Sequence, residues 1–148
     1  MLQNMNKEYI VKTLEETNEL AKQVAEELVI GNVITLTGTL GAGKTFFTSC
    51  LINHILSTYN LPQQNILSPT FNIVKEYQIQ NFSILHFDLS RLKNKNELYE
   101  LDIENCFENG ISIIEWPEIA EDIIYNIKYH IDIKIIQNNF RHYTITQY

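Results

Sequence analysis

The residues best suited to chemistry lie in one glycine-rich run, which reads Gly-Thr-Leu-Gly-Ala-Gly-Lys-Thr from Gly38 to Thr45. Backbone N–H groups can wrap a polyphosphate closely only where glycine lets the chain turn sharply. At this spacing a lysine reaches the β and γ phosphates, and the hydroxyl that follows it is a ligand for Mg²⁺. The run therefore predicts that Lys44 and Thr45 bind a nucleotide and its metal ion, in preference to an ordinary glycine-rich turn.

The sequence on either side of this run predicts the elements that must hold it. Residues 33–37 are apolar or β-branched, as in a central parallel strand that is covered on both faces. A helical stretch begins at Phe46, and the N-terminus of a helix adds unpaired N–H groups and a positive dipole end that favour phosphate. We therefore expect the run to join a buried strand to a helix.

The remaining patterns predict one α/β domain over residues 1–148. Thr13 and Glu16 have the spacing of a capping box, in which each side chain bonds the backbone N–H of the other, and this predicts a helix start. Strands are predicted at 9–11, 72–77, 83–88 and 111–115, a helix at 95–105, and a C-terminal antiparallel hairpin from 127–136 and 141–146. The expected fold is that of a P-loop NTPase, with a mainly parallel central sheet flanked by helices.

Two acids at predicted strand ends are candidates for the metal carboxylate. Asp88 and Glu115 each follow a run of apolar or small residues, and ligands of an open α/β sheet bind outside the carboxyl ends of its strands. A P-loop nucleotidase needs a carboxylate there for Mg²⁺ and a polar residue that orients the attacking water. The residues alone leave open which acid holds the metal, and also whether either one caps a helix or pairs with Arg91.

Composition and absent motifs narrow the class of nucleotide-binding protein. The one near match to a guanine-specific motif, residues 94–97, ends in glutamate and follows no strand, so adenine is expected. Arg91 and Arg141 are the only arginines. This low arginine content argues against the arginine-bearing lid that a small-molecule kinase closes over the transferred phosphate. The net charge of −7 argues against a broad basic surface for nucleic acid. A kinase and a nucleotide-dependent binding module remain alternatives to an ATPase.

No apolar run has the length of a membrane-spanning helix, which is about 18 residues or more. The N-terminus also lacks the apolar core of a secretory signal. We therefore expect a cytoplasmic protein that has no membrane partner.

Four motifs, taken in order, resemble the signature of the TsaE family, which is also called YjeE. They are Thr-Leu-Gly-Ala-Gly-Lys-Thr at 39–45, Ser-Pro-Thr-Phe at 68–71, His-Phe-Asp-Leu-Ser-Arg-Leu at 86–92 and Gly-Ile-Ser-Ile-Ile-Glu-Trp-Pro-Glu at 110–118. The resemblance implies an ATPase required for N6-threonylcarbamoyladenosine at position 37 of tRNAs that read codons beginning with A. It implies that the protein acts by binding the TsaB–TsaD heterodimer, in which TsaD transfers the threonylcarbamoyl group. ATP hydrolysis would reset that complex between turnovers, and the protein would contact tRNA only indirectly, through the complex.

The resemblance also assigns roles to single residues. Glu115 joins Thr45 as the preferred Mg²⁺ ligand, and Asp88 becomes a catalytic or water-positioning acid beside Lys44. Ser90 departs from the family's usual tyrosine, and Phe46 from its second threonine. The motif, the resemblance and the C-terminal arginine together predict these nucleotide-binding residues: Thr13, Thr39, Leu40, Gly41, Ala42, Gly43, Lys44, Thr45, Thr70, Trp116 and Arg141.

Overall fold

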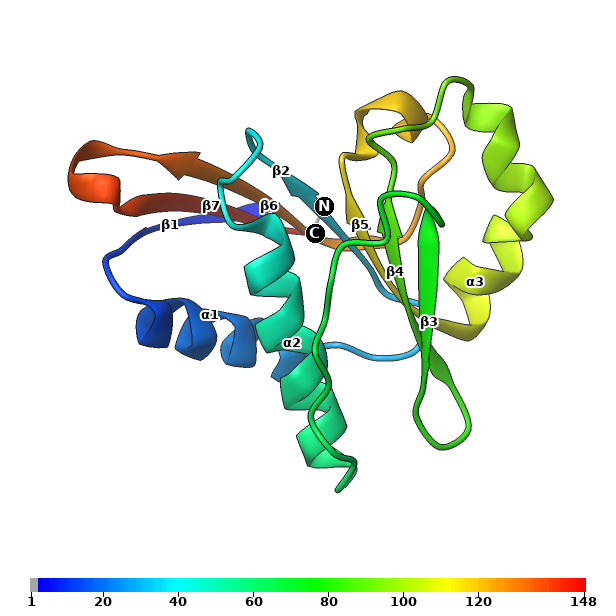
Figure 1. Ribbon diagram of the computed structural model, residues 1–148, viewed down its shortest axis with the longest axis horizontal. Coiled ribbons are helices and arrows are strands. Elements are labelled where there is room, and N and C mark those ends of the chain that lie inside the picture. Colours follow the sequence, from blue (N-terminus) through cyan, green and yellow to red (C-terminus); the bar gives the residue numbers. More distant parts are fainter. Residues whose placement is uncertain (1–2) are drawn as a thin grey trace.

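The computed structural model describes residues 3–148, which form one seven-stranded sheet and the helices packed on it (Figure 1). The strands are β1 (Met5–Val11), β2 (Val33–Thr37), β3 (Val74–Gln78), β4 (Ser83–Asp88), β5 (Gly110–Glu115), β6 (Ile127–Ile135) and β7 (Arg141–Gln147). The α-helices are α1 (Leu14–Glu26), α2 (Lys44–Thr58) and α3 (Ile103–Asn109), with 3₁₀ helices at Lys95–Leu101, Pro117–Ala120 and Gln137–Asn139. Within residues 3–148, no helix combines the length and the apolar character needed to cross a membrane.

The sheet is mixed, which corrects the expectation of a mainly parallel sheet. Its strand order is β1-β7-β6-β2-β5-β4-β3. β2 pairs in parallel with β5 and β6, and β4 pairs in parallel with β5. The pairs β1–β7, β6–β7 and β3–β4 are antiparallel. Short connections can join only antiparallel neighbours, so the two hairpins place antiparallel strands outside a parallel centre.

The C-terminal hairpin predicted from the sequence is confirmed as β6 and β7. The predicted strand at 9–11 is longer than expected, because β1 begins at Met5 and pairs with β7 along its whole length. Most of β1 is exposed at the edge of the sheet, and an edge strand lacks the apolar alternation by which strands are recognised in a sequence.

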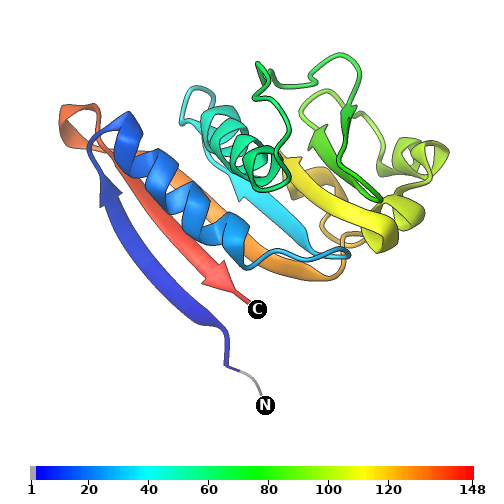
Figure 2. The same ribbon diagram turned by 90° about the horizontal axis from the view of Figure 1, so that it is seen from below.

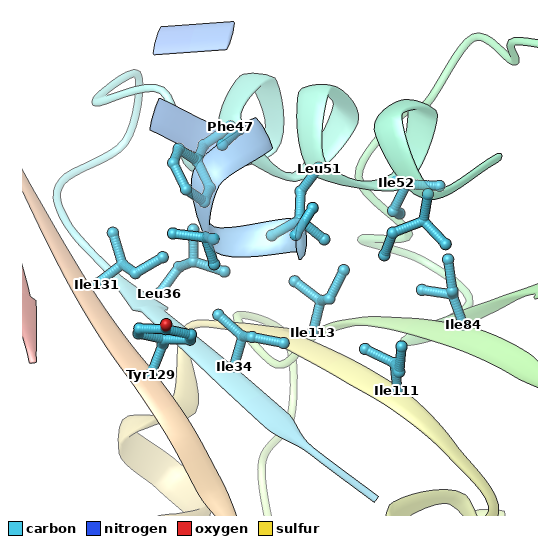
Figure 3. Packing of buried hydrophobic residues seen from close by; sticks show 14 of the residues in the cluster. Ile34, Leu36, Phe47, Leu51, Ile52, Ile84, Ile111, Ile113, Tyr129 and Ile131 are labelled. Carbon is cyan, nitrogen blue, oxygen red and sulfur yellow. The ribbon is translucent and has the colours of Figure 1, made fainter. Parts of the chain in front are cut away.

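The core that carries the site lies between the sheet and two helices. α1 and α2 lie side by side on one face of the sheet (Figure 2). Phe47, Leu51 and Ile52 of α2 face Leu36 of β2 and Ile113 of β5 (Figure 3), and all five side chains are fully buried. Burial of each such side chain contributes about 1.5–3 kcal/mol. This contact fixes the start of α2 against the carboxyl ends of β2 and β5.

The opposite face of β2, β4 and β5 is covered by the segment 95–124. Leu98 and Phe107 pack there on Phe87 and Ile114. The sequence predicted one helix at 95–105, and the structure divides it into a 3₁₀ helix and α3 at Asp102. Asp102 has a φ of 53°, a left-handed conformation that aspartate tolerates better than most residues.

The start of α1 confirms the cap at Thr13 but changes the predicted capping box. The Thr13 hydroxyl accepts a hydrogen bond of 3.1 Å from the backbone N–H of Glu16. The Glu16 carboxylate accepts from the N–H of Lys12 at 2.7 Å, one residue earlier than the capping box requires. Both side chains still satisfy backbone N–H groups at the helix entrance.

Candidate functional site

The predicted order of strand, loop and helix around the glycine-rich loop (residues 38–43) is confirmed. β2 ends at Thr37, and α2 begins at Lys44 with Gly43 as its N-cap. Gly41 and Gly43 have φ angles of 81° and 112°, which L side chains rarely adopt. The first N–H groups of α2 therefore lie at the loop, at the positive end of the helix dipole.

Gly38 is required for close packing as well as for its φ of 149°. A Cβ at this position would lie 2.6 Å from the carbonyl oxygen of Ile133, which belongs to β6. At Gly41, whose φ is 81°, an added Cβ would meet no atom of residues 3–148 within 4 Å. A side chain at position 38 would therefore cause a steric clash in addition to backbone strain, whereas a side chain at position 41 would cause backbone strain alone.

Gly38→Ala is expected to lower the free energy of unfolding by about 3 kcal/mol, because the clash with β6 adds to the backbone strain. Gly41→Ala is the matched control and is expected to cost about 1 kcal/mol from strain alone. Urea unfolding of both variants and the wild type measures the difference. Equal losses would show that Gly38 has no packing role.

Lys44 is folded back onto the loop. Its ammonium group donates hydrogen bonds to the carbonyl oxygens of Gly38 at 2.6 Å and Thr39 at 3.0 Å. The Nζ atom also lies 4.1 Å from the ring centroid of Trp116, as in a cation–π contact. Burial lowers the pKa of this amine, and the carboxylates of Glu115, Glu118 and Asp88 oppose that effect. Trp116 itself has a φ of 57°, a strained backbone for an aromatic residue.

Thr45 and Glu115 are in direct contact at the edge of the sheet. The Thr45 hydroxyl donates to Oε1 of Glu115 at 2.8 Å. Oε2 of the same carboxylate is hydrogen-bonded to Nε2 of His86. Glu115 is 1% exposed and His86 is fully buried. The structure thus brings the two predicted metal ligands together and adds a histidine that holds the carboxylate from its other side.

Asp88 lies beside Glu115, in register with it across β4 and β5. Its Oδ2 accepts hydrogen bonds from the hydroxyls of Ser68 and, at 3.4 Å, Thr70. Its Oδ1 accepts from the backbone N–H of Ser90 at 2.9 Å. Arg91 forms no ion pair with either acid within residues 3–148, and its guanidinium lies 4.2 Å from the ring centroid of Phe71. The alternative in which Arg91 pairs with a strand-end acid is therefore wrong.

The hydrogen bonds to Asp88 predict how acid affects stability. Burial raises the pKa of this carboxyl, but the hydrogen bonds from Ser68, Ser90 and Thr70 outweigh burial and leave the pKa below its ordinary value of 3.8. A lowered pKa in the folded state contributes stability that is complete above the ordinary pKa and is lost as the pH falls through the lowered value.

We therefore expect wild type and Asp88→Asn to differ most in unfolding free energy above about pH 5, and the difference to shrink as the pH falls through the lowered pKa of Asp88. Urea unfolding over this range measures the difference. A gap that does not change with pH would show that the Asp88 carboxylate makes no such contribution.

Most of the other predicted residues divide between two hollows on either side of the loop, whereas Thr39 lines neither and lies in a third hollow with Leu40 and Trp116. The first, of about 300 Å³, contains Lys44, Thr45, Thr70, Asp88, Glu115 and Trp116, together with Leu40, Gly41 and Gly43. The second, of about 310 Å³, contains Thr13, Ala42, Phe46 and Arg141. Phe46 and Gly43 line both hollows. Thr13 and Arg141 therefore do not join the acids, but lie on the other side of the same loop.

Arg141 is bound to the loop itself. Its Nε donates to the carbonyl oxygen of Ala42 at 2.8 Å, and one terminal nitrogen reaches the carbonyl of Gly41 at 3.4 Å. Its other terminal nitrogen bonds Asn139. The guanidinium thus ties the start of β7 to the loop while it lines the second hollow. Leu40, at the tip of the loop, is 88% exposed and lines the first hollow, not the second.

Sequence reasoning missed two residues of the site. His86 lies two positions before Asp88, so on a strand both side chains point to the same face, and this spacing was the signal available. Phe46 was noted only as a departure from a family pattern, yet it forms the wall between the two hollows. The hydrophobic side chain after Thr45 thus belongs to the site.

These features define the class of protein: a mixed α/β chain in which a glycine-rich loop feeds a helix beside two buried strand-end acids. A family model described as "Threonylcarbamoyl adenosine biosynthesis protein TsaE" matches residues 11–144. The chain therefore belongs to the TsaE family.

Curated relatives and a solved structure agree with this placement. The tRNA threonylcarbamoyladenosine biosynthesis protein TsaE of Rickettsia felis is 38% identical over 132 residues, which cover 89% of this chain and 75% of the relative. The protein of the same name from Bacillus subtilis is 34% identical over 132 residues, covering 89% and 80%. The crystal structure of Bacillus subtilis YdiB matches with a TM-score of 0.77 and 26% identity, over 99% of this chain and 88% of that one.

Proposed function

We propose that this protein is a Mg²⁺-dependent ATP hydrolase with a P-loop NTPase fold, and that it is required for threonylcarbamoyladenosine at position 37 of tRNAs reading codons that begin with A. The family model and the names of the relatives from Rickettsia felis and Bacillus subtilis support the pathway. The hydrolase activity rests on the site. We propose that the whole of residues 1–148 forms this one ATPase domain.

One observation carries the proposal: the contact of Thr45 with Glu115 beside Lys44 and Asp88, around a single hollow of about 300 Å³. The donor set fits Mg²⁺, which prefers oxygen ligands and is commonly held by one or two protein groups, with phosphates and water completing the shell. Thr45 and Glu115 would hold it there. When bound, Mg²⁺ supplies charge that neutralises the phosphates as the terminal P–O bond breaks.

The remaining roles in hydrolysis belong to side chains of the protein. Lys44 exchanges the carbonyls of Gly38 and Thr39 for phosphate oxygens, because its ammonium already lies inside the loop. Asp88 accepts a hydrogen bond from the attacking water and orients it toward the γ-phosphate. Ser68 and Thr70 contact Asp88, so they are suited to sense a γ-phosphate bound beside that acid.

The second hollow suits the adenine base. It lies at Ala42 and Gly43, next to the phosphate loop, and it is lined by Thr13, Phe46 and Arg141. An aromatic ring and a guanidinium both stack well on a planar base. We propose that Phe46 and Arg141 contact the base or ribose, and that Trp116 stays on the phosphate side, where it covers Lys44.

The net charge of the chain supports a role in which this protein does not itself bind the tRNA. The chain carries a net charge of −7, and tRNA binding rests on many Lys and Arg contacts with phosphate. We propose that the TsaB–TsaD heterodimer holds the tRNA, transfers the threonylcarbamoyl group and is reset by ATP hydrolysis in this subunit. We propose the cytoplasm as its location.

Two measurements test this proposal. Trp116 is the only tryptophan, so its fluorescence should change when Mg²⁺ and ATP draw Lys44 away from its ring. Multiple-turnover threonylcarbamoylation of tRNA by the reconstituted TsaB–TsaD complex should require both this protein and ATP. Product formation that rises instead with a nucleoside or sugar acceptor would identify a kinase and overturn the proposal.

A further inference from the structure

His86 is a buried polar side chain that the proposed hydrolysis does not use. It lies in β4 opposite Ile113 of β5, on the sheet face that packs against α2, and it is fully buried. Its Nε2 is hydrogen-bonded to Oε2 of Glu115. If packing were the only role of this position, an apolar residue would fill it at a lower free-energy cost, because burying a polar ring costs free energy unless the ring is hydrogen-bonded.

The hydrogen bonding assigns the proton of the ring. Glu115 presents a carboxylate oxygen, which accepts, so Nε2 carries the hydrogen. Among residues 3–148, the buried Nδ1 has no hydrogen-bond partner. Buried N–H groups without a partner are rarer than buried acceptors without one, so Nδ1 is the bare lone pair. The ring therefore has one polar contact, and that contact is with Glu115.

The two oxygens of Glu115 thus have different partners. Oε2 accepts from His86 and Oε1 accepts from the Thr45 hydroxyl at 2.8 Å. The Glu115 side chain is 1% exposed, so bulk water does not compensate for a lost partner. With both oxygens engaged, rotation of the carboxylate about its last bond would break two hydrogen bonds, and Oε1 stays turned toward α2 and the loop.

We propose that His86 is a positioning residue that fixes the Glu115 carboxylate for the divalent cation. This inference rests on the proposed function, because Glu115 is a metal ligand only if a nucleotide and Mg²⁺ bind at the loop. Hydrogen bonds from outer groups to metal ligands set the orientation of those ligands, and their removal lowers metal affinity about 10–100-fold. His86 acts on the cation through Glu115 and touches neither the nucleotide nor the attacking water.

Two amide replacements separate positioning from packing. In His86→Gln the amide nitrogen stands the same number of bonds from Cβ as Nε2 of histidine, so the donor to Glu115 is kept. In His86→Asn the amide nitrogen is one bond shorter and cannot reach. Binding of Mn²⁺ with ADP, followed by EPR, is expected to be weaker by about 10–100-fold in His86→Asn and His86→Leu, and to keep most of the wild-type affinity in His86→Gln.

The control is Ile113→Val, which removes one methylene from the strand position opposite His86. It is expected to lower the urea midpoint of the protein and leave Mn²⁺ affinity unchanged. ADP binding in EDTA, read from Trp116 fluorescence, is expected to be the same in all five proteins. Equal Mn²⁺ affinity of His86→Asn and His86→Gln would overturn the inference. Failure of the wild type to bind Mn²⁺ with ADP would instead overturn the metal site of the proposed function.

A measurement on the unaltered protein covers the case in which the variants fail to fold. The ¹⁵N shifts of the His86 ring distinguish the two tautomers, and the inference requires hydrogen on Nε2. Addition of Mg²⁺ and ADP is expected to shift the Nε2–H signal, because the Glu115 carboxylate then shares its charge with the cation. A hydrogen on Nδ1 alone, or an Nε2–H signal that does not respond to the cation, would overturn the inference.

Discussion

Lys44→Met is expected to lower the rate of ATP hydrolysis by about 100- to 1,000-fold, the usual loss when one charged or hydrogen-bonding group is removed from a transition state. The Lys44 side chain is 5% exposed and its ammonium lies inside the loop, bonded to two backbone carbonyls. Methionine keeps the length and the packing on Trp116 but has no charge. Charge develops on the phosphate oxygens during the transfer, so the loss falls mainly on the transition state.

Steady-state hydrolysis and multiple-turnover threonylcarbamoylation of tRNA measure this effect. Lys22→Met is the matched control, because Lys22 is an exposed lysine of α1 outside both hollows. The control should match the wild type in both assays. Equal multiple-turnover yields from Lys44→Met and the wild type would refute the proposed function, since the loop would then have no part in the modification.

Asp88→Asn is expected to lower turnover by about 100- to 10,000-fold, the range for loss of a group that accepts or directs a proton. Asparagine keeps an oxygen for the N–H of Ser90, but it replaces the second acceptor with a donor and removes the negative charge. The affinity for ATP is expected to stay the same or rise, because the carboxylate lies on the phosphate side and its charge repels the nucleotide. The loss should therefore appear as a lower kcat and not as a higher KM.

Asp122→Asn is the control for this variant. Asp122 pairs with Lys95 on the surface and lines neither hollow. This experiment also separates an enzyme from a nucleotide-dependent binding module. If Asp88→Asn loses hydrolysis and still supports tRNA modification in cells, the protein is a nucleotide-dependent binding module. Loss of both activities is expected if the protein is a hydrolase.

Local features of the site were predictable because neighbouring residues determine them. The strand, loop and helix around Gly38 to Thr45, and the cap at Thr13, follow from glycine spacing and from side chains that bond a nearby N–H. The convergence of Asp88 and Glu115 was predictable too, because parallel strands end at the same edge. The roles of these residues toward nucleotide and metal remain predictions.

Other features depend on contacts that no local pattern reveals. β1 pairs with β7 from the far end of the chain, and an exposed edge strand has few of the sequence features by which a strand is recognised. Arg141 bonds the carbonyls of Ala42 and Gly41, about a hundred residues away, and no local pattern in the sequence indicates that contact. The contact of His86 with Glu115 likewise joins two strands, and only their register brings the side chains together.

The folded-back position of Lys44 has a consequence for how tightly a nucleotide is held. Its ammonium already has two carbonyl partners and an aromatic ring. An incoming phosphate must displace these partners, so the binding free energy is the difference between two sets of contacts and not the full value of the new ones. Under the proposed function, release of the spent nucleotide would restore the bonds that its binding broke, and this lowers the free-energy cost of release.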